Sequence, residues 1–319
     1  MTLPDIKQPL VSVIIPTYNH AKFIGEAIES VLNQTYKNIE LIIIDNYSED
    51  NTEKIIRSFN DHRIRYMKFR NNRVIAASRN FGMKMAQGKY VAFLDSDDLW
   101  LLEKIEKQVY ILEKYTEVAL VYTNIEIFSE SSHFTLFRWG YSGNIFNQLI
   151  IKNFIPCPTV MIRKDILENI GSFDESYDLR YAEDYELWMR IAYTYKVYCI
   201  PKVLARYRVH PESTLGGNNI QTHEKSLTAL MFLSKKIDIP PKLIKKSLKT
   251  KYARIAIGYF EKGFIEKFLL NRDESFKYGI DLNLLILNFL YLFFGPKKSL
   301  KIVKYPLRIR RKILYGSTL

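Results

Sequence analysis

The chain of 319 residues contains only two cysteines, Cys157 and Cys199. They lie far apart and form neither a CxxC pair nor a Cys/His cluster, which argues against a disulfide framework and against a zinc site. Such sparse use of cysteine fits a reducing cytoplasm. The first residues, MTLPDIKQPLVSVII, place an acid and a proline before a short apolar stretch, so no secretion signal is predicted.

Glycine-rich nucleotide-binding signatures are also missing. A dinucleotide fold shows GxGxxG after its first strand and a P-loop shows GxxxxGK[ST], whereas the first turn here reads IPTYNHAKF. If the chain binds a phosphate-bearing ligand, the phosphates are therefore held by a metal ion and by basic side chains, and not by a glycine cradle.

Acids are absent from the end of the chain. The formal net charge is +13, and the segment 296–319 alone contributes +8 through Lys297, Lys298, Lys301, Lys304, Arg308, Arg310, Arg311 and Lys312. A surplus of basic residues attracts the phosphates of nucleic acids. Because this surplus is concentrated in the tail, and the first 200 residues are close to ordinary, we do not expect a nucleic-acid partner.

Apolar runs alternate with helical patterns through the first hundred residues. Strands are predicted at 10–15, 39–45, 63–69 and 89–95, with helices at 19–34, from Asp50 onward and at 73–87. Asp50 followed by Glu53 is typical of a capping box at a helix start. Single helices between strands imply parallel pairing, because a crossover helix returns the chain to the same edge. The predicted fold class is α/β.

Polar residues end three of these strands. In open parallel sheets, ligands bind beyond the carboxyl ends of the strands. Asp and Asn also initiate turns and cap helices, which is the alternative for each segment taken alone. Together they predict one polar site at one edge of the sheet, formed by Pro16, Thr17, Tyr18 and Asn19, by Asp45 and Asn46, and by Asp95, Ser96, Asp97 and Asp98.

The acids at the end of the fourth strand predict a cation site. Asp95 and Asp97 stand one residue apart on irregular backbone, so both carboxylates can face one small volume. Mg²⁺ or Mn²⁺ takes one or two carboxylates in such a site and completes its shell with water and substrate phosphate. Arg79, just before this strand, is the best candidate to pair with the phosphate oxygens. An ordinary exposed helix arginine is the alternative.

Four ordered blocks of the sequence resemble glycosyltransferase family 2. They are VSVIIPTYNHAKFIGEAIESVLNQTYKNIELIIIDNYSEDNT, SRNFGMKMAQGKYVAFLDSDDLW, YAEDYELWMR and YRVHPES, within residues 10–213. The resemblance implies a GT-A fold, in which a Rossmann-like, mostly parallel sheet carries helices on both faces. It also implies a nucleotide-sugar donor, usually a UDP-sugar, a divalent cation, and transfer with inversion at the anomeric carbon.

The resemblance further implies roles for individual residues. Asp95-Ser96-Asp97 matches the family's DxD motif, in which Asp97 ligates the metal and Asp95 lies nearer the ribose. Asp184 aligns with the general base that deprotonates the acceptor hydroxyl, and Glu183 and Trp188 lie on the acceptor side. The nucleobase is contacted by Thr17, Tyr18 and Asp45 with help from Asn46, and the remaining donor-binding residues are Pro16, Asn19, Arg79 and Ser96.

Several of these residues also have plainer interpretations. Asp184 lies in the first turn of a helix predicted from about Glu183, where acids are favoured by the helix dipole. Inverting transfer nevertheless needs one carboxylate as base, and a metal that stabilises the leaving group makes a general acid unnecessary. Trp188 and Trp139 are candidates to stack on sugars, and a core position is the alternative for Trp188, which stands at helical spacing from Asp184. His210, where family members close over the diphosphate, is either a metal ligand or a loop residue.

The sequence departs from the family pattern in two places. Asp45-Asn46-Tyr47-Ser48 stands where the family commonly has Asp-Asp-Gly-Ser, and we expect base recognition to survive because Asp45 remains. Asn71-Asn72-Arg73 stands where many relatives have a glycine after Asn. This second change leaves the donor nucleotide open, and Arg73 adds a second candidate partner for phosphate.

The pattern becomes helical after Gly216-Gly217-Asn218-Asn219. We therefore predict a boundary near residue 217. It separates a catalytic domain, with a nucleotide-binding half at about 1–100 and an acceptor half at 101–217, from a helical and basic C-terminal extension at 218–319.

One apolar stretch in this extension, residues 282–294, is interrupted only by Asn283 and Asn288. Its 13 residues are too few for a bilayer span, which needs about 20. Because the basic tail follows directly, the stretch predicts an interfacial anchor on an anionic membrane surface. Packing against the catalytic domain, or against another subunit of a homo-oligomer, is the alternative.

We expect a metal-dependent inverting glycosyltransferase on the cytoplasmic face of a membrane, which moves a sugar from a nucleotide-diphosphate donor to a glycan or lipid-linked acceptor. The donor sugar, acceptor and linkage depend on the stretch 126–182. A haloacid-dehalogenase-like phosphatase carries its DxD in the first strand before a hydroxyl residue, whereas here Leu99 follows and the motif closes the fourth strand. A non-catalytic, membrane-associated protein with a degenerate transferase fold would have lost Asp97 and Asp184.

Overall fold

A computed structural model of the chain describes residues 8–129, 135–137, 140–211, 213 and 219–315. The chain divides into two compact units. The first comprises residues 1–128, 136–146 and 154–208, and the second comprises residues 129–135, 147–153 and 209–319. The boundary predicted near residue 217 lies outside the described residues, and the last segment of the second unit begins earlier, at Val209.

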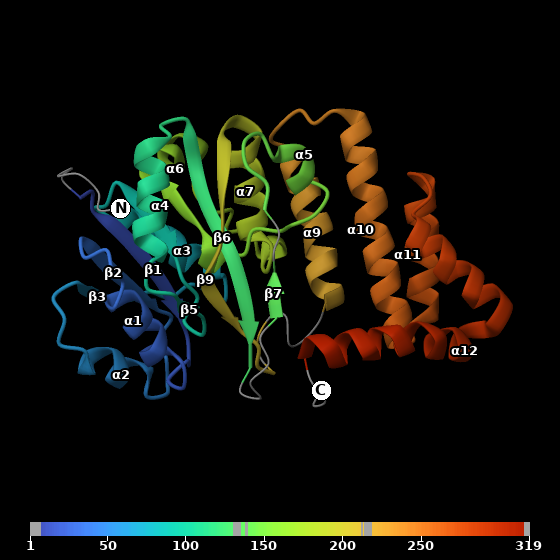
Figure 1. Cartoon of the computed structure of the whole chain (residues 1–319), viewed down its shortest axis with the longest axis horizontal. Helices are drawn as coiled ribbons and strands as arrows, with labels where there is room; N and C mark the ends of the chain where they lie inside the picture. Colours follow the sequence, from blue (N-terminus) through green and yellow to red (C-terminus); the bar gives the residue numbers. More distant parts are fainter. Residues whose placement is uncertain (1–7, 130–134, 138–139, 212, 214–218, 316–319) are drawn as a thin grey trace. The chain divides into compact units, whose positions relative to one another are not determined.

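The first unit is built on a nine-stranded sheet (Figure 1). Its main path has the order β3-β2-β1-β4-β8-β6-β9-β5, and β7 pairs with β6. β1 pairs in parallel with β2 and with β4, β2 pairs in parallel with β3, and β6 pairs in parallel with β9. In contrast, β8 and β5 run antiparallel to their neighbours. The strands are β1 (Val11–Thr17), β2 (Ile39–Asp45), β3 (Ile64–Lys68), β4 (Tyr90–Phe93), β5 (Leu99–Trp100), β6 (Val118–Phe128), β7 (Thr135–Phe137), β8 (Met161–Arg163) and β9 (Lys196–Arg208).

The order of the strands creates a switch point between β1 and β4. The chain builds outward from β1 to β2 and β3 and then returns to place β4 on the other side of β1, so that Val11 pairs with both Ile39 and Tyr90. At such a point the connections on either side diverge, which opens a crevice beyond the carboxyl ends of the strands. Thr17 and the residues after Phe93 lie at this edge.

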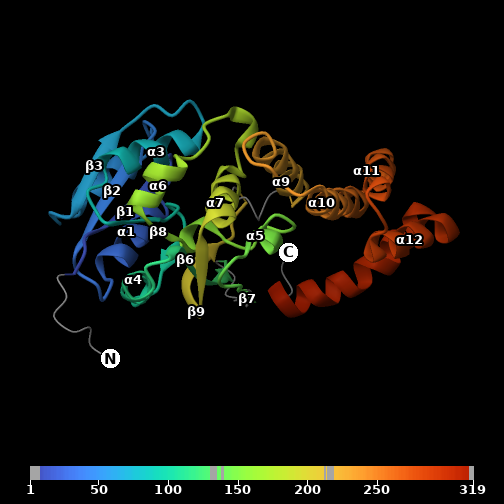
Figure 2. The ribbon, with the colours of Figure 1, turned by 90° about the horizontal axis from the view of Figure 1, so that it is seen from above.

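Helices cover both faces of the sheet, with α3 and α6 on one side and α1 and α4 on the other (Figure 2). Successive strand residues point to opposite faces. Val13 and Ile15 pack with α1 and α4, whereas Ile14 faces α3, where a Cβ at Gly82 would lie 2.7 Å from an Ile14 methyl. Gly82 thus lets α3 approach β1 closely. The helices are α1 (Ile24–Leu32), α2 (Thr52–Ser58), α3 (Ile75–Met85), α4 (Lys104–Lys114), α5 (Phe146–Leu149), α6 (Lys164–Ile170) and α7 (Glu183–Thr194).

The described part of the second unit is mainly helical and has its own apolar core. Its helices are α9 (Asn219–Leu233), α10 (Pro241–Lys262), α11 (Ile265–Lys277) and α12 (Leu282–Tyr315). Side chains from the last three meet at Ala256, Phe260, Phe268 and Leu284. A left-handed residue, Gly295 with φ 67°, interrupts α12. Within the described ranges, no helix combines the length and apolar character that a membrane crossing requires.

The local predictions are confirmed for the first four strands and the helices between them, with one correction. Asp50 accepts a hydrogen bond from the Thr52 N–H at 2.9 Å, but the N-cap of α2 is Asn51, without a side-chain cap hydrogen bond. Glu53 does not complete the capping box, because its carboxylate pairs instead with Arg57 at 2.8 Å and Lys68 at 2.6 Å. The sequence predicted a helical extension at 218–319 but no separate helix at the position of α11.

Candidate active site

The acids that follow β4 lie on a tight turn at the switch point. The Asp98 N–H donates to the Asp95 carbonyl at 3.0 Å and closes the turn. Between them, the Ser96 hydroxyl lies 2.7 Å from Nδ1 of His20, which comes from the turn after β1. The ends of β1 and β4 are thus joined through side chains, as expected for two strands that flank a switch point.

Arg208, at the end of β9, holds the same turn from the other side. Its N–H donates to Oδ1 of Asp98 at 2.9 Å, and its Nε donates to the Asp97 carbonyl at 2.9 Å. Its Nη2 also pairs with Glu26 at 2.9 Å. These bonds fix the backbone of Asp97, whose side chain remains partly exposed at the sheet edge.

Arg79 joins two acids from distant parts of the chain. Its Nη2 donates to Asp95 Oδ1 at 2.7 Å and its Nη1 donates to Glu183 Oε1 at 2.6 Å, while its guanidinium lies 5.6 Å from the centre of the Phe173 ring. With 3% of its surface exposed, Arg79 is not the exposed helix arginine that the sequence left open. It links the acid turn to the start of α7, and its contact with a donor phosphate stays a prediction.

The turns after β1 and β2 are tied together. The Asn46 N–H donates to the Thr17 carbonyl at 3.0 Å, and the Asn19 side-chain oxygen accepts from the Glu49 N–H at 2.8 Å. Pro16 and Thr17 end β1 in buried positions, whereas Tyr18 exposes 49% of its surface. An exposed ring on a braced turn suits stacking on a base, although the base contact itself stays a prediction.

Asp45 is fully buried at the end of β2. Its Oδ1 accepts from the backbone N–H of Ser48 at 2.8 Å and from the Ser48 hydroxyl at 2.6 Å, and its Oδ2 accepts from the Tyr66 hydroxyl at 2.6 Å. Burial, and then Asp45 itself, raise the pKa of Tyr66, so this phenol stays a donor. Asp45 thus shapes the loop, and its predicted contact with the nucleobase would have to use a remaining lone pair.

Left-handed backbone marks the loops around the site. Among the described non-glycine residues, φ is positive at Asn19, Tyr47, Asn72, Arg73 and Tyr181, with values of 51° to 72°. This region is unfavourable for residues with a side chain, and such strain is typical of functional sites. The two departures from the family pattern coincide with these positions. Tyr47 and Asn72 therefore keep the backbone angle that a glycine favours, although the glycine is missing.

The first turn of α7 begins at Glu183, as predicted. Asp184 follows, and its Oδ1 accepts from the Tyr185 N–H at 2.6 Å. Burial, and then the Glu183 carboxylate, raise the pKa of Asp184 to about 7. A carboxylate with such a pKa is suited to accept a proton near neutral pH. This agrees with the predicted role of general base, which no contact in the structure tests directly.

One predicted acceptor-side residue, Trp188, lies in the core of the first unit. Trp188 has no exposed surface and packs against Phe93 and Phe173, with ring centres 6.2 and 5.8 Å away. A fully buried indole cannot lie against a sugar in this conformation, so the core interpretation is favoured over the acceptor side. His210 belongs to the second unit, and its role as a metal ligand stays a prediction. Trp139 lies outside the described residues.

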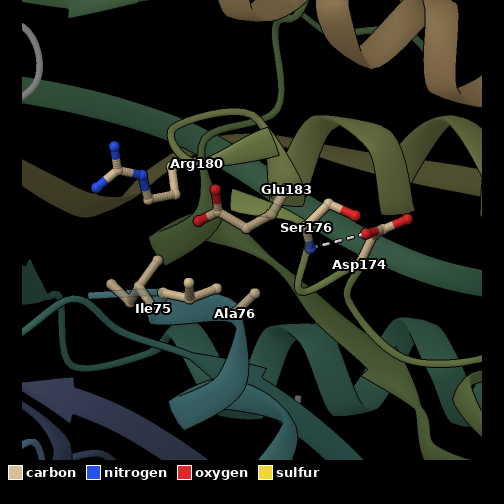
Figure 3. A pocket seen from close by; sticks show the side chains of 7 residues that line it. Ile75, Ala76, Asp174, Ser176, Arg180 and Glu183 are labelled. Atoms are coloured by element: carbon tan, nitrogen blue, oxygen red, sulfur yellow. Dashed lines mark hydrogen bonds between the residues drawn. The ribbon is translucent and has the colours of Figure 1, made fainter. Parts of the chain in front are cut away.

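A small hollow lies beside Glu183 (Figure 3). Its lining comes from residues 74–76 at the start of α3 and from the segment that leads into α7. The Glu183 carboxylate is directed toward the start of α3, whereas the Arg180 guanidinium points away. Among the described atoms, Glu183 Oε2 is buried without a hydrogen-bond partner.

The acid turn has the chemistry of a divalent-cation site. Burial, and then the carboxylates of Asp97 and Asp95, raise the pKa of Asp98 well above its usual value. Where the structure is described, no group of three or more His, Cys, Asp or Glu side chains is placed to hold a metal. Mg²⁺ and Mn²⁺ need only one or two carboxylates when a substrate phosphate completes the shell. The turn therefore fits a cation shared with a diphosphate.

Sequence reasoning missed His20 and Arg208. His20 stands in the block IPTYNH, beside predicted donor residues, and Arg208 stands in YRVH, two residues before His210. Their partners are 76 and 111 residues away in the sequence. Contacts at such separations leave no periodic signal, so only membership of the same blocks could have pointed to these residues.

Comparison with known proteins decides the family. The sequence profile described as Glycosyl transferase family 2 matches residues 12–171, half of the chain. An uncharacterized glycosyltransferase of Rickettsia typhi is 35% identical over 269 residues, which is 82% of this chain and 83% of that protein. The chain belongs to glycosyltransferase family 2. The resemblance seen in the sequence is confirmed, and the protein is a glycosyltransferase.

Other relatives of this family 2 glycosyltransferase have more specific names. The UDP-Glc:alpha-D-GlcNAc-diphosphoundecaprenol beta-1,3-glucosyltransferase WfgD of Escherichia coli is 36% identical over 57% of this chain and 69% of that protein. The solved structure of S. aureus TarS 1–349 in complex with UDP-GlcNAc aligns with a TM-score of 0.65 and 17% identity, over 93% of this chain and 91% of that one.

A second solved structure is the mannosyltransferase PcManGT from Pyrobaculum calidifontis in complex with GDP-Man and Mn²⁺. It aligns with a TM-score of 0.60 and 18% identity, over 98% of this chain and 88% of that one. At such identities the likeness concerns the fold alone. The GT-A fold expected from the resemblance and the C-terminal helices expected from the sequence pattern are confirmed.

Proposed function

We propose that this glycosyltransferase is inverting and metal-dependent and moves a sugar from a UDP-sugar to the hydroxyl of a lipid-linked acceptor. The observation that carries the proposal is the Arg79 bridge. One buried guanidinium binds Asp95 on the acid turn and Glu183 at the start of α7, next to Asp184. One side chain thus connects an acid of the proposed cation site to the residue next to the proposed base.

In this proposal the residues have separate tasks. Asp97 and Asp95 would hold Mn²⁺ or Mg²⁺, which supplies positive charge to the leaving diphosphate when bound. Asp184 accepts the proton of the acceptor hydroxyl, and its raised pKa supports this task. Tyr18 lies against the base of the donor. Glu183 would accept a hydrogen bond from a sugar hydroxyl through Oε2, which has no hydrogen-bond partner among the described atoms.

The choice of donor and acceptor is supported by the relatives. The E. coli relative is named for a UDP-glucose donor and a diphosphoundecaprenol-linked acceptor, and the TarS complex contains UDP-GlcNAc. A lipid-linked acceptor places the reaction at a membrane surface. Residues that would bring this enzyme to such a surface are found in α12.

The first half of α12 has two different faces. On one face, Leu284 and Leu287 are buried in the core of the second unit, and Asn288 accepts a hydrogen bond from Arg272 at 2.8 Å. On the opposite face, exposed apolar side chains recur at helical spacing. Its side chains expose between 40% and 68% of their surface and are Leu282, Leu285, Ile286, Phe289, Leu292 and Phe293.

We propose that this outer face of α12 rests on an anionic membrane, most simply the inner leaflet of the cell membrane. The apolar side chains would enter the headgroup boundary. The basic run that follows, residues 297–312, would meet anionic lipids at about 1 kcal/mol per charge. Pairing of the outer faces of two copies is the alternative, and it predicts a homo-oligomer in the absence of lipid.

Donor and metal binding can be tested by thermal shift on the full chain. UDP, GDP and UDP-sugars are titrated with and without Mn²⁺, and a ligand at 100 times its Kd stabilises by about 2.7 kcal/mol. UDP should stabilise more than GDP. Asp97→Asn should remove the Mn²⁺-dependent part of the thermal shift, whereas Asp178→Asn, which changes an exposed acid, should not. Equal shifts in wild type and Asp97→Asn would refute the cation site.

A further inference from the structure

The acid turn, residues 95–98, is tied to the start of α1 by His20. Nδ1 of this histidine lies 2.7 Å from the hydroxyl oxygen of Ser96. The histidine backbone is itself fixed, because its N–H donates to the hydroxyl of the buried Thr52 at 3.0 Å and its carbonyl accepts from the Phe23 N–H at 2.9 Å. The imidazole therefore contacts the acid turn from a backbone that the starts of α1 and α2 hold in place.

Arg208 holds the acid turn from the other side and shares a support with His20. Its Nε donates to the Asp97 carbonyl at 2.9 Å, and its guanidinium lies 5.1 Å from the centre of the Phe23 ring and 4.6 Å from the centre of the Phe128 ring. The same Phe23 ring meets the His20 imidazole edge to face, with ring centres 5.9 Å apart. His20 and Arg208 thus contact the turn at two points and both pack on one buried ring.

The acid turn needs support from outside because of its own charge. Its three carboxylates repel one another, and Asp98 Oδ2 is buried without a hydrogen-bond partner among the described atoms. His20 contacts the hydroxyl of Ser96, which stands between the two predicted metal ligands, and Arg208 contacts the backbone carbonyl of Asp97. Because these two bonds use a hydroxyl and a carbonyl, they position the turn without occupying its carboxylates.

Groups around a cation site decide how well its ligands bind. The ligands must be held within about 0.5 Å of their working geometry. Partners that orient them from outside are worth about 10–100-fold in metal affinity.

We propose that His20 and Arg208, packed on Phe23, are positioning residues that hold the acid turn in its cation-binding conformation. All three belong to the first unit. This role rests on the cation site proposed above and adds the residues that shape it. Neither His20 nor Arg208 touches the cation in this role, so their loss should weaken cation binding without removing a ligand.

A series of Mn²⁺ concentrations on the full chain tests the histidine. At saturating UDP, the Mn²⁺ concentration that gives half of the Mn²⁺-dependent thermal shift should rise about tenfold in His20→Leu and in Ser96→Ala. The double variant should be no weaker than either single variant, because both changes remove the same bond. His20→Asn, whose amide takes the place of Nδ1, should bind Mn²⁺ nearly as wild type does. His62→Leu changes an exposed histidine and is the matched control.

The same measurement tests Arg208. Arg208→Lys keeps the charge but replaces the planar fork with a point charge, so half of the shift should again need about ten times more Mn²⁺. Arg206→Lys is the matched control on the same strand, because Arg206 pairs with Glu126 at 2.7 Å. If Arg208→Lys does not fold, the histidine variants decide the proposal.

Three results would overturn the proposal, and each has a different meaning. Equal Mn²⁺ midpoints in wild type, His20→Leu and Ser96→Ala, with a change only in unfolding in EDTA, would show that the contact serves stability alone. A weaker UDP-dependent shift of His20→Leu in EDTA would place His20 in base binding. No Mn²⁺-dependent shift in wild type would refute the cation site itself, and the positioning role with it.

Discussion

The two parts of the chain use charge in opposite ways. Residues 1–208 contain 26 basic and 26 acidic side chains, whereas residues 209–319 contain 21 basic and 8 acidic ones, so the whole net charge of +13 belongs to the second part. In the first part, charges such as Arg79 and Arg208 are paired with acids and shape a site. In the second part, the surplus creates a positive field.

This difference teaches why the net charge of the whole chain is a poor guide to its function. A positive field attracts anionic partners over a distance and says nothing about the chemistry of a site. The proposed catalytic groups lie in the part whose net charge is zero, and the basic part holds the proposed membrane face. If the two parts have separate tasks, variants in one should leave the task of the other unchanged.

The largest expected effect is on catalysis alone. Asp184→Asn keeps the shape of the side chain but cannot accept the proton of the acceptor, and loss of a general base costs about 10²–10⁴-fold in rate. We expect kcat to fall by this factor while the UDP-dependent thermal shift and vesicle binding stay as in wild type. Near-normal turnover would remove Asp184 from its role, and a parallel loss of vesicle binding would break the separation between the two parts.

The next effect concerns stability. Arg79→Met leaves Asp95 and the buried Glu183 without their cation, and breaking a buried ion pair in this way costs about 3–5 kcal/mol. Denaturant unfolding of the full chain measures the change. Arg57→Met is the matched control, because Arg57 pairs with Glu53 at the surface and such pairs contribute only about 0–1 kcal/mol. Equal losses in both variants would contradict the structural role of the Arg79 bridge.

Much of the fold in the first part was predictable because its signals are local. Two such signals are visible in the sequence, namely the continuous apolar run at 39–45 and the acids that follow the run at 89–94. Each predicts a strand with a polar end. The bridge from Arg79 to Glu183 spans 104 residues and the contact from His20 to Ser96 spans 76. Such contacts depend on how strands are ordered in the sheet, which no local pattern specifies.

The second part was less predictable for a different reason. In α12 both faces of the segment 282–294 are apolar, so periodicity could not show that Leu284 faces the core and Leu285 the outside. In α11 the sequence IEKFLLNRDESFK contains six charged residues among thirteen, and its few apolar positions gave no clear helical signal. Only packing against α10 and α12 distinguishes the buried side chains from the others.

The two faces of α12 offer a sharper test of the second part. Leu285→Ser combined with Phe289→Ser removes two exposed apolar side chains, each of which contributes about 1.5–3 kcal/mol if it becomes buried. The affinity for anionic vesicles should fall about a hundredfold, whereas the free energy of unfolding should stay unchanged. Leu284→Ala, on the inner face, should instead lower the free energy of unfolding by about 2–5 kcal/mol. Unchanged vesicle binding in the double variant would refute the membrane face, and loss of a dimer would favour the homo-oligomer.

The smallest expected effect is on the pH dependence of the first part. The pKa of Asp184 is raised to about 7 by burial and by Glu183. Below pH 7 the carboxyl is protonated and cannot accept a proton, so kcat/KM should fall about tenfold per pH unit on the acid side and level off above pH 7. Glu183→Gln removes the neighbouring negative charge and should move this midpoint to lower pH, whereas Asp178→Asn should not. A midpoint that is the same in all three proteins would mean that a group other than Asp184 controls the acid limb.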